Sequence, residues 1–293
     1  MKKERSRDRC RMEKSYLEIL NEVRRDISSP FRALIELNRE KRTRKAREKI
    51  FEHIGTRIKK TGTLIIGVRC RDGIVIGSDR KIVRGGETEY SNKIFEFDIG
   101  GKILFAAEGL TGIRDDFFLL LNYEIRRRRG VDTLYEVKII VEDIISELTE
   151  RYKDRIREPY PIGVLMGGLE KISEGKAVLY YIYSQGYGEQ VGFRCTGHGG
   201  DYGYSLAKFL YGPHLAPELT VEEVARRVAF TISWVAEDVD TTVGGGIDIF
   251  MIKDENPAAQ RLSNEVVNRE KEHAKEIKER LYEILFTREL SRG

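Results

Sequence analysis

Residues 62–68 read GTLIIGV, so that a glycine and a threonine stand directly before an apolar, β-branched run. Such a run is typical of a buried strand. A threonine that begins a strand can become a nucleophile if the bond before it is cut, because the freed α-amine then acts as the base for the threonine hydroxyl. Gly62 gives the backbone the freedom that a tight, self-cleaving conformation needs. We therefore predict that Thr63 is a nucleophile exposed by cleavage after Gly62.

Two charged side chains further along the chain fit the same chemistry. Asp79 ends a second β-branched run at 73–79, and Lys93 opens a third at 93–97. An acid and a lysine close to a free α-amine can shift the pKa of that amine and orient the threonine hydroxyl. The plainer alternatives are a surface acid for Asp79 and an ordinary lysine at a strand entry for Lys93.

The bulk composition sets limits on the class of protein. The chain has 293 residues, of which 40% are apolar and 34% are charged, enough for one large domain or two small ones. The three cysteines are not closely spaced, which argues against a disulfide framework and against a zinc site. So few cysteines are consistent with a protein of the reducing cytoplasm. No apolar run has the length of a membrane span, and the N-terminus lacks the apolar core of a signal peptide. We expect a cytoplasmic protein that needs neither a metal nor a cofactor.

Charge divides the chain into two parts. Residues 1–62 hold 20 Lys and Arg against 10 Asp and Glu, whereas the rest holds 32 against 38, so a basic leader precedes an acidic body. Acidic residues interleave with the basic ones and few aromatic residues accompany them. This pattern favours a helical arm that docks on an acidic surface over a nucleic-acid-binding arm.

The hydrophobic periodicity changes from helical to strand-like at Thr63. Before it, an apolar stripe near a 3.6-residue period predicts two helices, at 11–28 and 31–59. Beyond it, the pattern predicts strands at 63–70, 73–79, 93–97, 102–107, 162–168, 177–183, 192–196 and 247–253, and helices at 112–129, 132–153, 201–211, 220–238 and 258–286. Strands, two helices, strands, two helices and a strand indicate an α+β fold, a four-layer α-β-β-α sandwich.

The stretch from Thr61 to about Ile252 resembles the proteasome family of N-terminal-nucleophile hydrolases, and its catalytic β-type more than its α-type. The segments that carry the resemblance are Gly62-Thr63, 72–76, 78–81, 93–98, 161–164, 196–200, Asp240 and 244–248. We divide the chain into three parts: a basic helical leader or propeptide at 1–62, a sandwich domain at 63–253 and a charged C-terminal helix at 254–293, which is longer than the resemblance requires. Thr61 is a rival nucleophile, but its interval to Asp79 is two residues longer than the family's.

The resemblance also implies a role for each site residue. Thr63 would attack an amide carbonyl, Asp79 would orient the lysine and the amine end of Thr63, and Lys93 would carry a proton. Asp240 would be the acid that stabilises the α-amine. The alternative for Asp240 is a helix-end acid in a solvated loop.

Two positions depart from the family pattern. The family has a serine three residues after the second acid, where this chain has Val243, and Thr241 or Thr242 could supply the hydroxyl instead. The serine of the family's Gly-Ser-Gly turn is replaced by His198, a residue type that changes charge near neutral pH and can take part in catalysis. A hydrogen-bonded loop histidine is the other interpretation of His198.

Two functions follow from the resemblance. The first is a threonine-type peptidase or amidohydrolase that acts on unfolded proteins or peptides within a homo-oligomeric ring, with α-type subunits or an ATPase unfoldase as partners. The second is a non-catalytic, α-like ring subunit with a permanently retained leader. Asp240 and the glycines after it favour the first function, and Val243 and His198 favour the second.

Overall fold

The computed structural model describes residues 62–84, 87–128, 130–154 and 160–284. The helices predicted at 11–28 and 31–59, and with them most of the predicted leader, lie outside the described residues. The last nine residues of the predicted C-terminal part lie outside them as well.

One five-stranded antiparallel sheet contains the strand that follows Thr63. Its strand order is β10-β1-β2-β11-β12. The strands are β1 (Ile65–Arg69), β2 (Gly73–Asp79), β10 (Phe193–Thr196), β11 (Ile247–Lys253) and β12 (Ala259–Arg261). The predicted hairpin of β1 and β2 is confirmed, with Ile65 opposite Ser78. Every residue of β2 is buried, because both faces of this central strand are covered.

A second five-stranded antiparallel sheet faces the first. Its order is β5-β6-β7-β8-β9. The strands are β5 (Ile94–Asp98), β6 (Lys102–Gly109), β7 (Ile162–Lys171), β8 (Glu174–Ile182) and β9 (Gly188–Gln190). The predicted pairing of 93–97 with 102–107 is confirmed as β5 with β6. A separate hairpin, β3 (Lys81–Arg84) with β4 (Glu87–Tyr90), lies between the predicted strands at 73–79 and 93–97, where we predicted no strand.

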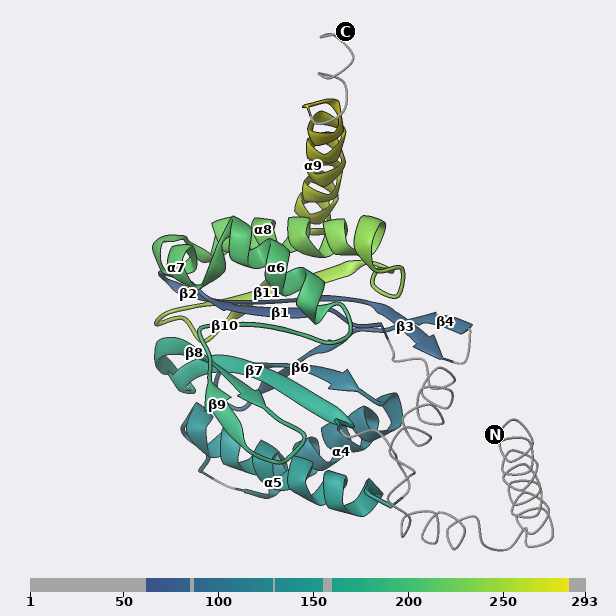
Figure 1. Ribbon diagram of the computed structural model, residues 1–293. Coiled ribbons are helices and arrows are strands. Elements are labelled where there is room, and N and C mark those ends of the chain that lie inside the picture. Colours follow the sequence, from purple (N-terminus) through teal and green to yellow (C-terminus); the bar gives the residue numbers. More distant parts are fainter. Residues whose placement is uncertain (1–61, 85–86, 129, 155–159, 285–293) are drawn as a thin grey trace, which may run out of the picture. The chain divides into compact units, whose positions relative to one another are not determined.

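Helices cover the outer face of each sheet, which gives the predicted four layers (Figure 1). The helices are α4 (Thr111–Arg127), α5 (Leu134–Tyr152), α6 (Gly200–Leu210), α7 (Gly212–Leu215), the 3₁₀ turn η1 (Ala216–Glu218), α8 (Val221–Trp234), the π-helical turn η2 (Val235–Val239) and α9 (Asn264–Tyr282). Helices α4 and α5 lie on the second sheet, and α6 and α8 lie on the first. The long helices α5 and α8 each begin with a capping box, in which a threonine and a glutamate exchange hydrogen bonds at the helix N-terminus.

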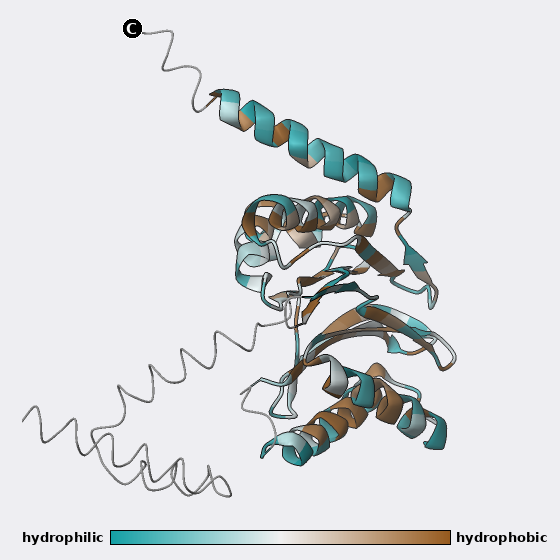
Figure 2. Ribbon diagram, turned by 90° about the vertical axis from the view of Figure 1, so that its right-hand side faces the viewer, coloured by the Kyte–Doolittle hydropathy of each residue, from teal (hydrophilic) through white to brown (hydrophobic). Residues whose placement is uncertain are grey.

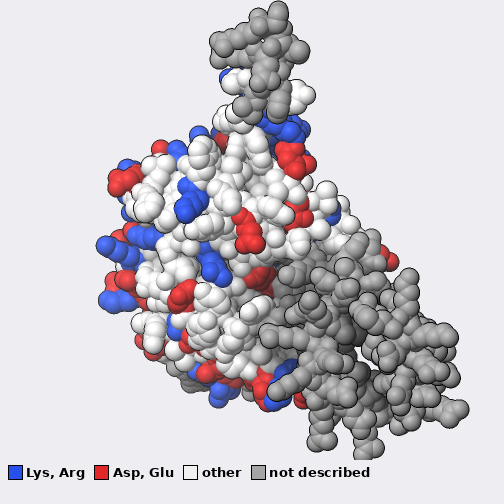
Figure 3. All heavy atoms as spheres, in the orientation of Figure 1, with Lys and Arg blue, Asp and Glu red and all other residues white. Residues whose placement is uncertain are grey.

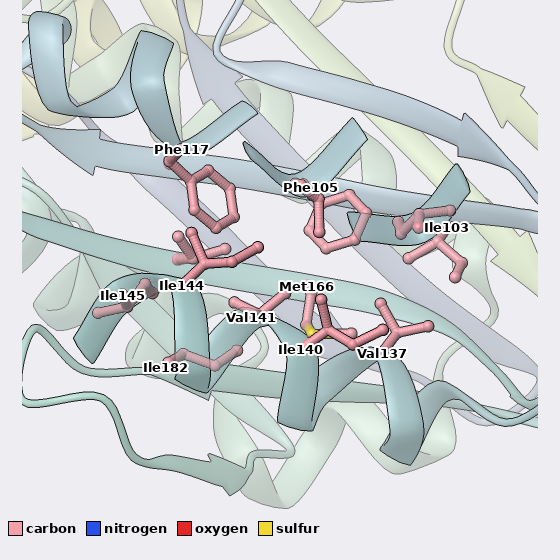
Figure 4. Packing of buried hydrophobic residues seen from close by; sticks show 14 of the residues in the cluster. Ile103, Phe105, Phe117, Val137, Ile140, Val141, Ile144, Ile145, Met166 and Ile182 are labelled. Atoms are coloured by element: carbon pink, nitrogen blue, oxygen red, sulfur yellow. The ribbon is translucent and has the colours of Figure 1, made fainter. Parts of the chain in front are cut away.

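Three hydrophobic layers hold this arrangement together. The layer between α4, α5 and the second sheet includes Phe117, Val141 and Met166, whose side chains meet in Figure 4. A middle layer joins the two sheets through residues such as Ile76 and Leu104. A third layer lies between the first sheet, α6 and α8. Burial of this much apolar surface is the main force that stabilises a sandwich fold.

The C-terminal part differs from the prediction of a helix over 258–286. Residues 259–261 form β12, which extends the first sheet by one strand beyond the predicted end of the sandwich domain. Helix α9 begins at Asn264 because the Ser263 side chain accepts the N–H of Val266 and caps it. Most of α9 is hydrophilic in Figure 2, and only Val267 and Ala274 are buried along it.

On the face drawn in Figure 3, basic and acidic side chains are interspersed over the described part of the chain. None of its helices combines the length and the apolar character needed to cross a membrane.

Candidate active site

Asp79 lies at the centre of the site, fixed by backbone donors from three parts of the chain. It is the last residue of β2 and is fully buried. Its Oδ1 accepts the N–H of Leu64 at 2.9 Å, and its Oδ2 accepts the N–H groups of Lys81 and Gly244 at 3.1 and 3.0 Å. These bonds hold the carboxylate in one orientation, and the interpretation of Asp79 as a solvated surface acid is therefore wrong.

Lys93 extends from the residue before β5 to the same carboxylate. Its Nζ lies 2.6 Å from Asp79 Oδ1 and donates a second hydrogen bond to the carbonyl oxygen of Gly62 at 3.1 Å. The side chain is almost fully buried. Burial lowers the pKa of Lys93, although the nearby Asp79 carboxylate opposes this effect. A lysine of this kind gives up a proton more readily than a lysine in water does.

Thr63 presents its hydroxyl to the peptide bond that precedes it. The Oγ1 atom donates a hydrogen bond of 2.8 Å to the carbonyl oxygen of Gly62. The carbonyl oxygen of Thr63 accepts the N–H of Gly199 at 3.0 Å. Gly197 adopts a φ of +90°, and a Cβ at that position would lie 2.2 Å from the Thr63 carbonyl oxygen. Only glycine therefore allows the 196–200 turn to approach Thr63 this closely.

Asp240 follows the π-helical turn η2, and its N–H donates to the carbonyl oxygen of Val235 at 2.8 Å. Its Oδ2 lies 2.8 Å from His198 Nδ1, and its Oδ1 accepts the Thr242 hydroxyl at 2.6 Å and the Thr242 N–H at 2.9 Å. Burial raises the pKa of Asp240, but the hydrogen bonds from Thr242 and His198 outweigh it and leave the pKa lowered. With 7% exposure, Asp240 is not the solvated loop acid of the alternative interpretation.

Close packing joins the Asp240 cluster to the Thr63 cluster. A Cβ on Gly62 would lie 2.0 Å from the carbonyl oxygen of Thr242. Glycine is therefore required at this position for reasons of space. Val243 is buried in the layer beneath α8, so it brings no polar group to the site.

All five predicted site residues thus lie in two adjoining clusters, Thr63 with Asp79 and Lys93, and His198 with Asp240. The contact of Gly244 with Asp79 was not expected from the sequence, and the run of three glycines at 244–246 was the available signal for it. Both Thr241 and Thr242 were candidate hydroxyl donors, and the hydroxyl that reaches Asp240 is that of Thr242. In the described ranges, no group of three or more His, Cys, Asp or Glu side chains is arranged to hold a metal ion.

The comparisons with known proteins point to one family. The family model described as proteasome subunit matches residues 59–252. The proteasome subunit beta of Archaeoglobus fulgidus is 24% identical over 201 residues, which cover 66% of this chain and 86% of that protein. The proteasome subunit beta of Thermoplasma acidophilum is 21% identical over 212 residues, which cover 72% and 94%.

Solved structures show the same fold at lower identity. Anbu from Yersinia bercovieri, described as an ancestral beta-subunit, superposes with a TM-score of 0.64 at 16% identity and covers 75% of this chain and 95% of its own. A helical assembly of the Anbu complex from Pseudomonas aeruginosa gives a TM-score of 0.62 at 19% identity, with 74% and 95% covered.

Proposed function

This chain belongs to the proteasome family, and we propose that it is a threonine-type peptidase whose nucleophile, Thr63, is freed by cleavage after Gly62. The family membership rests on the match over residues 59–252. The catalytic activity, the cleavage site and the roles of the individual residues are our proposal.

One observation carries the proposal: the carbonyl oxygen of Gly62 accepts hydrogen bonds from both Thr63 Oγ1 and Lys93 Nζ. The first contact brings the attacking hydroxyl next to the carbonyl of the bond to be cut. The second places a hydrogen-bond donor where negative charge would develop on that oxygen during the attack, which is the arrangement of an oxyanion hole. A threonine in an ordinary strand needs neither contact.

Self-cleavage would proceed as an acyl shift. Thr63 Oγ1 attacks the carbonyl carbon of Gly62, the C–N bond to Thr63 breaks, and the hydroxyl proton passes to the leaving nitrogen, directly or through water. Water then hydrolyses the resulting ester, which releases a leader ending in the carboxylate of Gly62. The free α-amine of Thr63 remains.

Turnover of other peptides would use the same hydroxyl. The α-amine, with an ordinary pKa of about 7.7–8.0, takes the proton of Thr63 Oγ1 as the hydroxyl attacks a substrate carbonyl. Asp79 fixes Lys93 beside the nucleophile, and Asp240 stabilises the amine when it is protonated. Water releases the acyl group. The contact between Thr242 and Asp240 supplies a hydroxyl close to the place where the family has the serine that Val243 replaces.

The second function, a non-catalytic subunit with a retained leader, is favoured by one feature. His198 Nδ1 is hydrogen-bonded to Oδ2 of Asp240. The α-amine that cleavage would create on Thr63 could bind this oxygen only if the histidine moved away. The two functions differ in whether the bond after Gly62 is ever cut.

Assembly and substrates are also part of the proposal. The likeness to a structure of a helical assembly supports self-association of this chain, and we propose a homo-oligomer that encloses the site and takes unfolded chains or peptides. The described thiols, Cys70 and Cys195, are free, which supports a reducing compartment such as the cytoplasm.

A pair of alanine variants tests the proposal. Thr63→Ala should give a chain that keeps its leader and cleaves no peptide, because the hydroxyl and the future amine belong to the same residue. Thr61→Ala is the matched control and should still begin at Thr63 after processing. Peptide turnover by Thr63→Ala, or a loss of processing in Thr61→Ala alone, would contradict the assignment of Thr63.

A further inference from the structure

Glu108, Tyr181 and Thr196 form a polar cluster between the two sheets. Glu108 lies near the end of β6 and Tyr181 lies in β8, both in the second sheet. Thr196 is the last residue of β10, in the first sheet. The middle layer between the sheets is built mainly from apolar side chains, so a polar group there has to find its hydrogen-bond partners within the protein. The cluster is therefore a directional link between the sheets.

One carboxylate oxygen organises this cluster. Glu108 Oε1 accepts the Tyr181 hydroxyl at 2.7 Å and also accepts the hydroxyl of Thr196. The two hydroxyl oxygens lie 3.2 Å apart, and both residues are buried. Gly163 stands opposite Glu108 on β7, and a Cβ there would lie 2.4 Å from the Tyr181 hydroxyl oxygen and 2.8 Å from Glu108 Oε1. Glycine at this position leaves the space in which the three side chains meet.

The Thr196 end of the cluster leads directly to the proposed nucleophile. Thr196 begins the 196–200 turn, which packs against the backbone of Thr63. Within that turn the N–H of Gly199 donates to the Thr63 carbonyl oxygen at 3.0 Å, and Gly197 lies so close to this oxygen that a Cβ would be 2.2 Å from it. A bond that fixes the Thr196 side chain therefore also restrains the backbone that contacts Thr63.

The Glu108 end leads to the lysine of the site. Strand β6 pairs with β5, and the N–H of Ala107 contacts the carbonyl oxygen of Lys93 at 3.4 Å. Lys93 Nζ in turn donates to the carbonyl oxygen of Gly62. The hydrogen bond between Glu108 and Thr196 thus joins the strand that supports Lys93 to the turn that contacts Thr63.

We propose that Glu108 is a positioning residue for the reaction of Thr63. Its hydrogen bond to Thr196 sets the distance between the 196–200 turn and the sheet that carries Lys93, and so holds the Thr63 hydroxyl at the Gly62 carbonyl. The inference rests on the proposed peptidase function and adds to it a residue that acts through Thr196. Such a residue matters because a displacement of about 1 Å in an attacking group can lower a rate by about 100-fold.

Substitutions of Thr196 test the link from the side of the turn. Thr196→Val keeps the shape of the side chain, removes the hydroxyl that Glu108 accepts, and should slow self-cleavage by roughly 10- to 100-fold. Thr196→Ser keeps the hydroxyl and should restore most of the rate, which intact mass at intervals after synthesis measures. Thr149→Val is the matched control in α5, where it removes a hydroxyl that donates to the Ser184 carbonyl oxygen at 2.7 Å, and should leave the rate unchanged.

Glu108→Gln tests the link from the side of the acceptor, and decides the matter if Thr196→Val does not fold. It keeps the size of the side chain but replaces a charged acceptor by a neutral, weaker one, so it should also slow self-cleavage. Combined with Thr196→Val it should add little, because the two residues act through one bond. Variant chains that do reach a Thr63 N-terminus should cleave peptides with a lower kcat and an unchanged KM, because the link positions the nucleophile and binds no substrate.

Self-cleavage of Thr196→Val and of Glu108→Gln at the rate of the unaltered protein would overturn the role of Glu108 and leave the peptidase function standing. Equal slowing in Thr196→Ser and Thr196→Val would do the same, since the hydroxyl would then be irrelevant. If the unaltered protein is never cut after Gly62, the peptidase function fails and the inference fails with it.

Discussion

Lys93 and Asp79 form a buried ion pair, with Lys93 Nζ 2.6 Å from Asp79 Oδ1 and both side chains almost completely shielded from water. A buried pair of this kind seldom stabilises a fold by itself, because removing both charges from water costs about as much as their attraction returns. Lys93 makes a second contact, with the carbonyl oxygen of Gly62. The pair therefore fixes the lysine at the peptide bond that precedes Thr63, which is the bond that the proposed function requires to be cut.

Replacing Lys93 by methionine should slow self-cleavage by roughly 100- to 1000-fold, the usual effect of removing one donor to a developing oxyanion. Intact mass measured at intervals after synthesis gives the rate. Lys102→Met removes a half-buried lysine that pairs with Asp98 and serves as the control. Processing of the Lys93 variant at the unaltered rate, with a normal melting temperature, would show that the lysine is structural only.

Asp240 should make stability depend on pH in the acid range. Its pKa is lowered in the folded protein, so the folded state binds this proton less tightly than the unfolded chain does. Its stabilising effect is then complete above the unfolded pKa, about 3.9, and is lost as the pH falls through the lower folded value. Asp240→Asn should cost about 1–3 kcal/mol at pH 7, and less at pH 3.

Urea unfolding of both proteins at the two pH values measures this difference. Asp143→Asn, at an exposed carboxylate, is the matched control and should change the free energy of unfolding very little. A constant difference between Asp240→Asn and the unaltered protein at both pH values would contradict the stabilising role of the ionised carboxylate.

The two neighbouring threonines should differ in their effect on activity. The Thr242 hydroxyl donates to Asp240 at 2.6 Å, whereas Thr241 contacts the Lys81 ammonium only through its backbone carbonyl. Thr242→Val keeps the shape of the side chain, removes that donor, and should lower kcat by about tenfold. Thr241→Val should behave like the unaltered protein. Equal effects of the two substitutions on peptide turnover would assign the hydroxyl no specific role.

Gly197 should tolerate no side chain. Its φ is +90°, and an added methyl carbon would lie only 2.2 Å from the Thr63 carbonyl oxygen. Gly197→Ala should therefore cost about 1–3 kcal/mol and displace the turn from the nucleophile. Gly192→Ala, where a Cβ meets open space, is the control. Thermal unfolding and the rate of self-cleavage are the two measurements, and an unchanged cleavage rate in Gly197→Ala would show that this turn does not position Thr63.

The layers and most of the elements could be predicted from the sequence because they depend on local patterns. The β1–β2 hairpin has β-branched runs and a short polar turn, and α5 and α8 have an apolar stripe of helical period. The β3–β4 hairpin lacked such a signal, because the residues of β4 are polar and exposed. Strand β12 has three residues and depends on its pairing with β11.

For the candidate site, the sequence indicated which residues to consider but not the contacts between distant parts of the chain. The order of Thr63, Asp79 and Lys93 along the chain indicated which residues to examine, and the contact of Lys93 with Asp79 agrees with the expected role of the acid. Their catalytic roles stay predictions. The N–H of Gly244 on Asp79 joins positions 165 residues apart, and the run of glycines at 244–246 marks an unusual turn but does not identify Asp79 as its partner.

The proposed peptidase function requires that the chain cut itself between Gly62 and Thr63, and intact mass with N-terminal sequencing of the purified protein decides whether it does. We expect a chain that begins at Thr63, together with a released leader that ends at Gly62. A protein that still carries its leader after days at elevated temperature would contradict the peptidase function and support the non-catalytic subunit instead.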